Sequence, residues 1–435
     1  MNSNVGKYLS RWAEPSARPL AEALSDRYFA ALGVPLLGES HAFLEGYRAA
    51  ARQAPGRVLI VAVVNATVAT APELRAQNGA LLQQLCRGAR ALSEHAFFER
   101  HAEFDLLTLD RSSPGRELPE RQGVGLARKI AGDLLLAMFE RGALDLPFLL
   151  MTDADATLPA DYFARAERER ARGPAALIYP FRHVPGVDPE VVHQATQLYE
   201  ALIRYHVLGL AWAGSAYAYH SIGSTLAVHV DAYAGVRGVP KRAAGEDFYL
   251  LDKLGKLGPI RKLDGAPVAI ASRRSARVPF GTGPRVEQLL NQRGALVASD
   301  QAFLALKHVL LGLDRVAASS APAPLAETLN ELPPALAAQA AQVIEELGLP
   351  AAMRAAIEQV GQGNLRRRLH TWFDALKTLQ FLHLLRDRGA SELELTDALS
   401  RAPFCPAGDP ALEATLERLR DAECRLPSEL GPALL

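Results

Sequence analysis

Arg57-Val-Leu-Ile-Val-Ala-Val-Val-Asn65 is an unbroken run of apolar, mostly β-branched residues between two polar ends. Strands that are buried on both faces have this composition, and they belong to parallel sheets covered by helices. Residues 104–110 and 148–152 are similar apolar runs. Helical patterns at residues 72–92 and 125–141 separate the three runs. Strands that alternate with helices of this length predict an α/β fold with a mostly parallel, Rossmann-like sheet.

The rest of the chain predicts two further regions beside this core. Residues 1–55 have amphipathic helical patterns interrupted by prolines, which predicts an N-terminal helical extension. Residues 56–288 then form the α/β domain. Residues 289–435 are rich in Ala and Leu at helical spacing and predict an all-helical accessory domain, with residues 316–334 as a linker rich in Ala, Ser and Pro.

The overall composition excludes several classes of protein. The 48 basic and 48 acidic residues cancel, so bulk charge gives no reason to expect a nucleic-acid partner. Cys86, Cys405 and Cys424 are far apart, without the spacing of a zinc or redox motif, which favours a reducing, cytoplasmic setting. No stretch reaches the roughly 18 apolar residues of a membrane span, so we expect no transmembrane segment.

Two carboxylates follow the apolar run in Phe148-Leu-Leu-Met-Thr-Asp-Ala-Asp-Ala-Thr157. Residues two apart lie on the same side of a strand, so Asp153 and Asp155 can face one ligand. Carboxylate oxygens suit Mg²⁺ or Mn²⁺, and Mg²⁺ typically completes its coordination with substrate phosphates. The alternative is that these residues are the polar start of a loop, where Asp is common.

Polar residues also end the other two predicted strands. Ligands of open α/β sheets bind beyond the carboxyl ends of the strands, so Asn65 and Asp110 should line the same edge as Asp153. Asp110 can accept hydrogen bonds from a nucleotide base or ribose. It can equally be the turn residue of Asp110-Arg-Ser-Ser-Pro-Gly115.

Two helix starts are further candidates. In Gly123-Val-Gly-Leu-Ala-Arg-Lys129, free backbone amides and the charge of Arg128 can serve a phosphate, although many helices begin with glycines. In Gly245-Glu-Asp-Phe248, Glu246 or Asp247 can be a general base for an acceptor hydroxyl. The alternative for this acidic pair is stabilisation of a helix N-terminus.

Taken in order, these motifs resemble the family-2 nucleotide-sugar glycosyltransferases, whose fold is called GT-A. The resemblance covers residues 57–285 and depends on five motifs in register. They are Val64-Asn65 with Leu109-Asp-Arg-Ser-Ser113, Gly123-Val-Gly-Leu-Ala-Arg-Lys129, Thr152-Asp-Ala-Asp155, Ile222-Gly-Ser-Thr-Leu-Ala-Val-His229 and Gly245-Glu-Asp-Phe248.

The resemblance implies a donor site and a metal. Asp153 and Asp155 would hold Mg²⁺ or Mn²⁺ against the diphosphate of a nucleoside-diphosphate sugar. Asp110 would contact the nucleotide base, and Arg128 the nucleotide or its phosphates.

The resemblance also implies an acceptor side. Asp247, or else Glu246, would deprotonate an acceptor hydroxyl in an inverting transfer. Gly223 and Ser224 would lie near the donor sugar or the acceptor.

The chain departs from the family pattern at two positions. Arg111 replaces the second acid of the family's Asp-Asp-Gly-Ser, and His229 replaces a frequent Arg or Lys, which puts base recognition and acceptor binding in doubt. The motif of processive polysaccharide synthases is absent, so we expect a non-processive enzyme.

A basic segment follows the last predicted strand, Ser272-Arg-Arg-Ser-Ala-Arg-Val-Pro-Phe-Gly-Thr-Gly-Pro-Arg285. Arg274 and Arg277, with Arg273, can close as a lid over the donor diphosphate or bind an anionic acceptor. The alternative is an exposed basic loop. A third metal ligand could come from one of five histidines: His183, His193, His206, His220 and His229.

Two rival functions stay open. Asp153-Ala-Asp-Ala-Thr157 also fits the nucleophile loop of haloacid-dehalogenase-like, Mg²⁺-dependent phosphatases, with Asp153 attacking phosphorus and Asp155 as acid and base. A non-catalytic sugar-nucleotide-binding protein with the same fold is the other rival. The acceptor is an unidentified hydroxyl compound, and a homo-oligomer would form through the helical domain.

Overall fold

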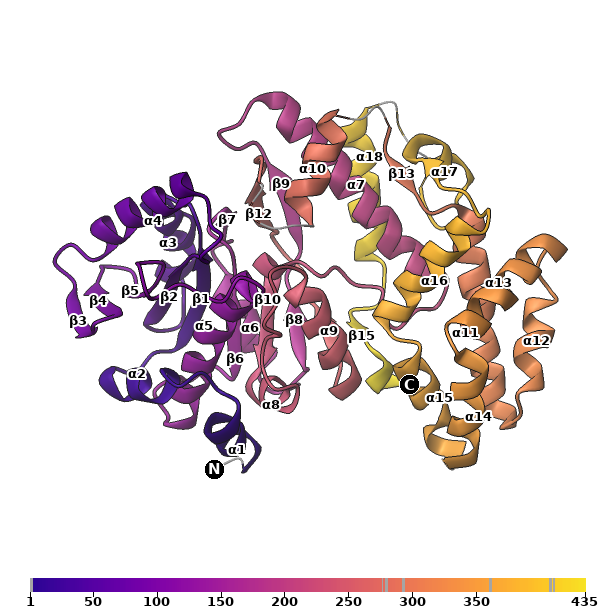
Figure 1. Ribbon diagram of the computed structural model, residues 1–435, viewed down its shortest axis with the longest axis horizontal. Coiled ribbons are helices and arrows are strands. Elements are labelled where there is room, and N and C mark those ends of the chain that lie inside the picture. The colour runs from indigo at the N-terminus through magenta and orange to yellow at the C-terminus, as the bar shows by residue number, and fades with distance from the viewer. Residues whose placement is uncertain are drawn as a thin grey trace. The chain divides into compact units, whose positions relative to one another are not determined.

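The chain forms two compact units in a computed structural model (Figure 1). The first unit comprises Met1–His193 and Ser221–Arg285, and the second comprises Gln194–His220 and Val286–Leu435. The structure describes residues 3–275, 277, 281–291, 294–359, 362–406, 409 and 411–435.

Parallel strands form the centre of the sheet in the first unit. β1 (Ala30–Leu36) pairs in parallel with β2 (Val58–Asn65) on one side and β6 (Phe148–Met151) on the other, and β2 pairs with β5 (Asp105–Arg111). All residues of β2 are buried, as its apolar run predicts. α5 (Gly123–Glu140) packs on β1, β2 and β6. The mixed α/β class is confirmed.

Antiparallel strands extend this parallel centre on both sides, so the sheet is mixed. The strand order is β11-β8-β10-β6-β1-β2-β5-β4-β3. β10 pairs in antiparallel fashion with β6 and β8, and β4 does so with β5 and β3. The bounds of the added strands are β3 (Arg90–Ser93), β4 (Ala96–Arg100), β8 (Ala176–Ile178), β10 (Leu226–His229) and β11 (Ile260–Lys262).

A small second sheet has the order β7-β12-β9. It consists of β7 (Ala156–Thr157), β12 (Val268–Ala271) and β9 (Phe181–Val184). The backbone amide of Ala271 donates to the carbonyl of Asp155 at 2.9 Å. This sheet therefore brings the segment that begins at Ser272 to the loop that carries Asp155.

The N-terminal 55 residues differ from the expected helical extension, because they contain the central strand β1. Gly33 and Pro35 are uncommon in strands, so the sequence of residues 30–36 does not show a strand pattern. A Cβ on Gly33 would lie 2.8 Å from the Cβ of Ala131, so glycine lets α5 approach the sheet closely. Pro35 lies beyond Leu32 and Gly33, the residues of β1 that pair with β6, so its missing N–H costs no bond on that side.

Helices account for most of the remaining first unit. Before β2 these are α1 (Ser3–Arg11), α2 (Ala17–Ala23), η1 (His41–Leu44) and α3 (Glu45–Arg52). After β2 they are α4 (Pro72–Leu85), α6 (Tyr162–Arg168), η2 (Gly223–Thr225), α8 (Val230–Gly235) and α9 (Glu246–Leu257). No helix among the described residues has the length and apolar character needed to cross a membrane.

The second unit is built mainly around α11 (Asp300–Ser319), which contacts α12, α13, α15 and α16. Its further helices are α12 (Ala323–Leu329), α13 (Pro334–Glu346), α14 (Leu349–Gln359), α15 (Gln362–Trp372), α16 (Ala375–Asp387), α17 (Leu395–Arg401), α18 (Leu412–Cys424) and η3 (Pro432–Leu434). Short strands are β13 (Leu296–Val297), β14 (Leu393–Glu394) and β15 (Glu429–Leu430). α7 (Glu190–Trp212) and α10 (Thr282–Asn291) each begin in the first unit and continue into the second.

The linker expected at residues 316–334 is wrong, because α11 extends to Ser319 and α12 occupies much of the rest. Leu325 and Leu329 of α12 are buried. A Cβ on Gly312 would lie 2.7 Å from Leu325 Cδ1, so this glycine lets α12 pack closely on α11. Tertiary burial of two leucines thus outweighs the composition of a linker.

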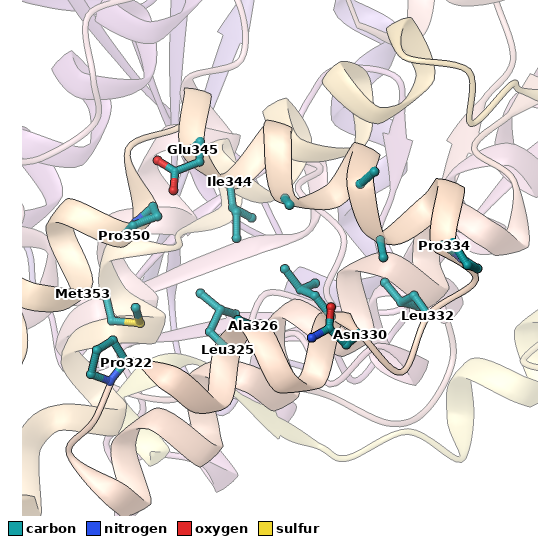
Figure 2. A pocket seen from close by; sticks show the side chains of 14 residues that line it. Pro322, Leu325, Ala326, Asn330, Leu332, Pro334, Ile344, Glu345, Pro350 and Met353 are labelled. Carbon is teal, nitrogen blue, oxygen red and sulfur yellow. The ribbon is translucent and has the colours of Figure 1, made fainter.

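A hollow of about 610 Å³ lies in the second unit between α12, α13 and α14, and Figure 2 shows the side chains that line it. Its lining is apolar apart from Asn330 and Glu345. Asn330 has no ionisable group, so these two side chains cannot act as an acid–base pair.

Candidate active site at the carboxyl edge of the sheet

Asp153 is held from three directions in the loop after β6. Its Oδ1 accepts from Arg128 Nη2 at 2.5 Å, and its Oδ2 accepts from the hydroxyl of Ser224 at 2.6 Å. Tyr47, which is fully buried, donates its hydroxyl to the Asp153 carbonyl at 2.8 Å. The carboxylate is nevertheless 27% exposed. Asp153 therefore has a fixed position and a face open to a ligand.

Gly223 lies under the guanidinium of Arg128. A Cβ at this position would lie 2.7 Å from Arg128 Cζ, and closer still to Nη2, so a larger residue cannot replace Gly223 without moving Arg128. The neighbouring Ser224 is fixed twice, since its hydroxyl donates to Asp153 and its carbonyl accepts from Thr152 Oγ1 at 2.9 Å. The Gly-Ser pair thus contacts the Asp153 loop directly.

Glu246 and Asp247 begin α9 but have different surroundings. Gly245 precedes them with φ +69°, a left-handed conformation that favours glycine. Glu246 is buried and accepts from Arg128 Nε at 2.8 Å. Asp247 is partly exposed and accepts the backbone amide of Phe248 at 2.8 Å. No ion pair to Asp247 is found within the described part of the chain.

The pKa of Asp247 is raised to about 7. Burial is the main cause, and the negative charge of Glu246 adds to it. Arg128 and the amide of Phe248 act in the opposite direction. A carboxyl with a pKa near neutrality can accept a proton from a substrate more readily than an ordinary aspartate.

Asp155 is held in an ion-pair network with Glu39, which follows β1. One guanidinium, that of Arg273, donates to Glu39 Oε1 at 2.7 Å and to Asp155 Oδ2 at 2.8 Å. Arg277 pairs with Glu39 as well and donates to the carbonyl of Gly38 at 2.9 Å. Burial raises the pKa of Asp155, against the opposing charge of Arg273.

The basic segment after β12 thus reaches the site through Arg273 and Arg277. Arg274 has an exposed side chain, and its backbone amide donates to Asp188 at 2.7 Å. Residues 276 and 278–280 of the expected lid lie outside the described residues, so the lid stays a prediction.

Asp110 has the turn geometry that was the alternative to nucleotide binding. Its Oδ1 accepts the backbone amides of Ser112 and Ser113, each at 3.0 Å, and its Oδ2 pairs with Arg116 at 2.8 Å. These hydrogen bonds lower its pKa despite the opposing effect of burial. The carboxylate is 5% exposed and already fixed by its own loop.

Asn65, at the end of β2, has the opposite character. It is 4% exposed, and its side-chain oxygen has no hydrogen-bond partner in the part of the chain that the structure describes. A buried acceptor without a donor is costly, so this oxygen is the group at this edge most in need of a ligand or a water.

Asn78 of α4, which the sequence analysis did not identify, connects three loops at this edge. It is fully buried, accepts from the amide of Gly38 at 2.8 Å, and donates to the carbonyl of Asn65 at 3.0 Å and to Ser112 Oγ at 2.8 Å. The loops after β1, β2 and β5 therefore have fixed relative positions. An asparagine within a helical pattern gives little sequence signal for such a role.

The glycines before Arg128 have a packing role rather than the geometry of a phosphate cradle. The amide of Gly125 donates to the carbonyl of Arg242 at 2.9 Å. A Cβ on Gly125 would lie 2.6 Å from the Arg242 nitrogen. Lys129 is buried and pairs with Asp133 of the same helix at 2.8 Å.

The donor set at the edge is suitable for a hard cation. Glu39 and Asp155 already share one positive group, Arg273, and all their donor atoms are oxygens, as Mg²⁺ and Mn²⁺ prefer. No cluster of three or more His, Cys, Asp or Glu side chains arranged for a metal occurs among the described residues. His193 bonds Ser272 at 2.8 Å, and His229 accepts from the amide of Asp231.

Comparisons with known proteins leave the family of this chain open. No protein-family model matches it, and no curated protein matches it. Among solved structures, the chain is similar to the mannosyltransferase PcManGT from Pyrobaculum calidifontis in complex with GDP-Man and Mn²⁺. The identity is 16%, the TM-score is 0.33, and the likeness covers 86% of this chain and 92% of the other. A functional argument must therefore start from the site residues.

Proposed function

We propose that this chain is a glycosyltransferase with a GT-A core that transfers a sugar from a nucleoside-diphosphate sugar to an acceptor hydroxyl. The observation that carries the proposal is the arrangement around Arg128. The first carboxylate of the Asp-x-Asp motif, Asp153, and the first acid of the pair that begins α9, Glu246, contact the same guanidinium, although 93 residues separate them. In a glycosyltransferase, the carboxylate that binds the cation of the sugar donor and the acids that include the general base would be adjacent in this way.

Asp247 is the proposed general base. It is partly open to solvent, and its raised pKa, about 7, is suited to removing a proton from a hydroxyl during the transfer. Glu246 is less suited, because it is buried and bonded to Arg128. Attack from the side of Asp247 on the sugar carbon opposite the leaving diphosphate would invert that carbon.

A divalent cation would be held by Asp155 together with the open face of Asp153. Each carboxylate oxygen has two lone pairs, so Asp153 Oδ2 keeps one beside its bond to Ser224. When bound, the cation would supply positive charge to the diphosphate leaving group. Arg273 currently neutralises Asp155, and its guanidinium is well suited to a phosphate once it leaves that carboxylate.

The nucleotide would bind at the ends of β2 and β5. The buried oxygen of Asn65 needs a donor, and the N–H groups of a nucleobase or a ribose hydroxyl can provide one. Asp110 fixes the loop after β5 by accepting the amides of Ser112 and Ser113. Arg128 is not in a position typical of a phosphate ligand, since it is 6% exposed.

The phosphatase alternative has less support from the geometry. Its nucleophile would be Asp153, but the ion pair with Arg128 withdraws electron density from this carboxylate and makes it a weaker nucleophile. The acidic pair of α9 would also have no role in that reaction. A phosphatase would form an aspartyl-phosphate and be trapped by beryllofluoride, whereas a glycosyltransferase would not.

The decisive experiment screens nucleoside diphosphates and nucleotide sugars by thermal shift, with and without Mn²⁺, and then tests transfer with the stabilising donor. A ligand that binds only the native state raises its apparent stability. Asp155→Asn should lower turnover at least 100-fold and abolish the Mn²⁺-dependent part of the shift. The exposed Asp264→Asn is the matched control. Release of inorganic phosphate from sugar phosphates, without nucleotide-sugar binding, would overturn the proposal.

A further inference from the structure

Arg128 uses its whole guanidinium inside the protein. Nε donates to Glu246 at 2.8 Å and Nη2 to Asp153 at 2.5 Å. Nη1 points to the carbonyls of Gly223 at 3.3 Å and Thr152 at 3.5 Å. Only 6% of Arg128 is exposed, so few of its guanidinium N–H groups remain for a substrate.

Three separate elements meet at this side chain. Arg128 extends from α5, Asp153 follows β6, and Glu246 begins α9. The space is built for an arginine, because the absence of a side chain at Gly223 makes room for the guanidinium. The guanidinium of Arg128 is a rigid plane, so it fixes the carboxylates of Asp153 and Glu246 at defined angles. Arg128 therefore does more than neutralise their charge.

We infer that Arg128 is a positioning residue that binds Asp153 and Glu246 on two edges of one guanidinium and thereby leaves Asp247 as the carboxylate that receives the acceptor proton. This inference rests on the proposed function and assigns the division of labour between the two acids of α9. It also differs from the role that the family resemblance implies, in which Arg128 contacts the nucleotide or its phosphates.

The charges around Asp247 support this division. Burial and Glu246 raise the pKa of Asp247, Arg128 and the amide of Phe248 lower it, and Asp153 adds a smaller upward effect. The two variants Arg128→Met and Glu246→Gln should therefore move this pKa in opposite directions. Loss of the positive charge raises it, and loss of the negative charge lowers it.

The test is a titration of the Asp247 carboxyl by carbon NMR, in which Asp247→Asn identifies the signal by its disappearance. We expect Arg128→Met to shift the midpoint up by about one unit or more, and Glu246→Gln to shift it down. Arg128→Lys, which keeps the charge but loses the fork, should leave the midpoint close to that of the wild type. This readout requires no turnover, and Arg128→Gln, which also removes the positive charge, takes the place of Arg128→Met if that variant does not fold.

A second readout is the pH dependence of kcat beside calorimetric binding of the stabilising nucleoside diphosphate, the binding being measured without divalent metal so that the position of Asp153 as a metal ligand does not affect it. The acidic limb of kcat should follow the same opposite shifts, while nucleotide binding changes less than threefold. Unmoved midpoints, or tenfold weaker nucleotide binding by Arg128→Lys at an unchanged midpoint, would overturn the inference. Absence of any sugar transfer by the wild type, with opposite NMR shifts intact, would instead defeat the proposed function and leave the charge arrangement standing.

Discussion

Asp247 shows how a single proposed catalytic residue affects stability. Its pKa rises from an ordinary 3.8 to about 7 in the folded chain, mainly through burial and then through Glu246. Between these values the folded protein keeps a proton that the unfolded chain releases. Stability therefore falls as the pH rises through this window, and the loss is complete above pH 7.

We predict that Asp247→Asn is more stable than the wild type at pH 8 by about 1–2 kcal/mol, allowing for partial solvent access to the side chain. The gain should shrink toward pH 4, where the wild-type carboxyl is protonated. Urea unfolding at pH 8, 6 and 4 measures it, with the exposed Asp264→Asn as control. A constant difference across the three pH values would contradict the raised pKa.

At the scale of elements, two glycines of the first unit differ in the space around them. Gly125 lets the start of α5 touch the backbone at Arg242, whereas Gly79, exposed on α4, has open space where a Cβ would be. We predict that Gly125→Ala destabilises the first unit by about 2–3 kcal/mol through steric overlap. Gly79→Ala should stabilise it by roughly 0.5–1 kcal/mol through helix propensity. Denaturant unfolding of the two variants compares them directly, and an equal effect of both would refute the packing role.

Asp314 links α11 to α15 in the second unit. It accepts from Arg366 at 2.8 and 2.9 Å and bonds His370 at 2.8 Å. Although burial opposes the change, these partners lower the pKa of Asp314 to about 2. The stabilisation is present above pH 4 and is lost as the pH falls through 2.

We therefore expect Asp314→Asn to cost the second unit about 1 kcal/mol at pH 7, since the carboxylate is 34% exposed and partly screened. The difference should disappear near pH 2. Circular dichroism during urea unfolding at both pH values reports it, with the exposed Glu327→Gln as reference. A loss that persists at pH 2 would show that shape, rather than charge, links the two helices.

Sequence patterns identified the elements in which local and tertiary preferences agree. β2 and β5 are long apolar runs, and α5 begins and ends close to its predicted bounds. The sequence analysis did not predict β1, because Gly33 and Pro35 are poor strand formers. The close approach of Ala131, which requires glycine at position 33, is visible only in the structure. An element could be predicted when its local sequence pattern was strong, as in β2, and not because it is central to the fold, as β1 is.

The site follows the same division. Asp153, Asp155 and Asp247 belong to short motifs with spacing that can be recognised in one sequence. Glu39 bonds Arg273, 234 residues away, and Asn78 bonds Gly38, 40 residues away, and neither Glu39 nor Asn78 lies in a local pattern. Their roles depend on strand order, which the sequence analysis did not contain.

At the scale of the whole chain, the cysteines can report on each unit separately. Burial raises the pKa of Cys86, in the first unit, to about 11 and that of Cys405, in the second, to about 12. Cys424 is exposed. We predict that a thiol reagent at pH 8 modifies Cys424 first, and modifies Cys86 and Cys405 only as their own units open.

Mass spectrometry of peptides along a urea series would give the two opening transitions side by side. Cys424→Ser removes the fast phase and serves as control. Rapid modification of Cys86 in the native protein would contradict the expected protection.

The chain passes from the first unit to the second at residue 194, returns at residue 221 and enters the second unit again at residue 286. This order has a consequence for its synthesis. β10 lies between β6 and β8 and is made after residues 194–220, which belong to the second unit. Until β10 is made, the sheet of a nascent chain is incomplete, and the edge of β6 is unpaired. By then α7 has been translated, but its partners in the second unit follow only after residue 285. The first unit can complete its sheet only after the first segment of the second unit has been made, and that segment lacks its partners until residues beyond 285 follow, so this protein should depend on chaperones more than its length suggests.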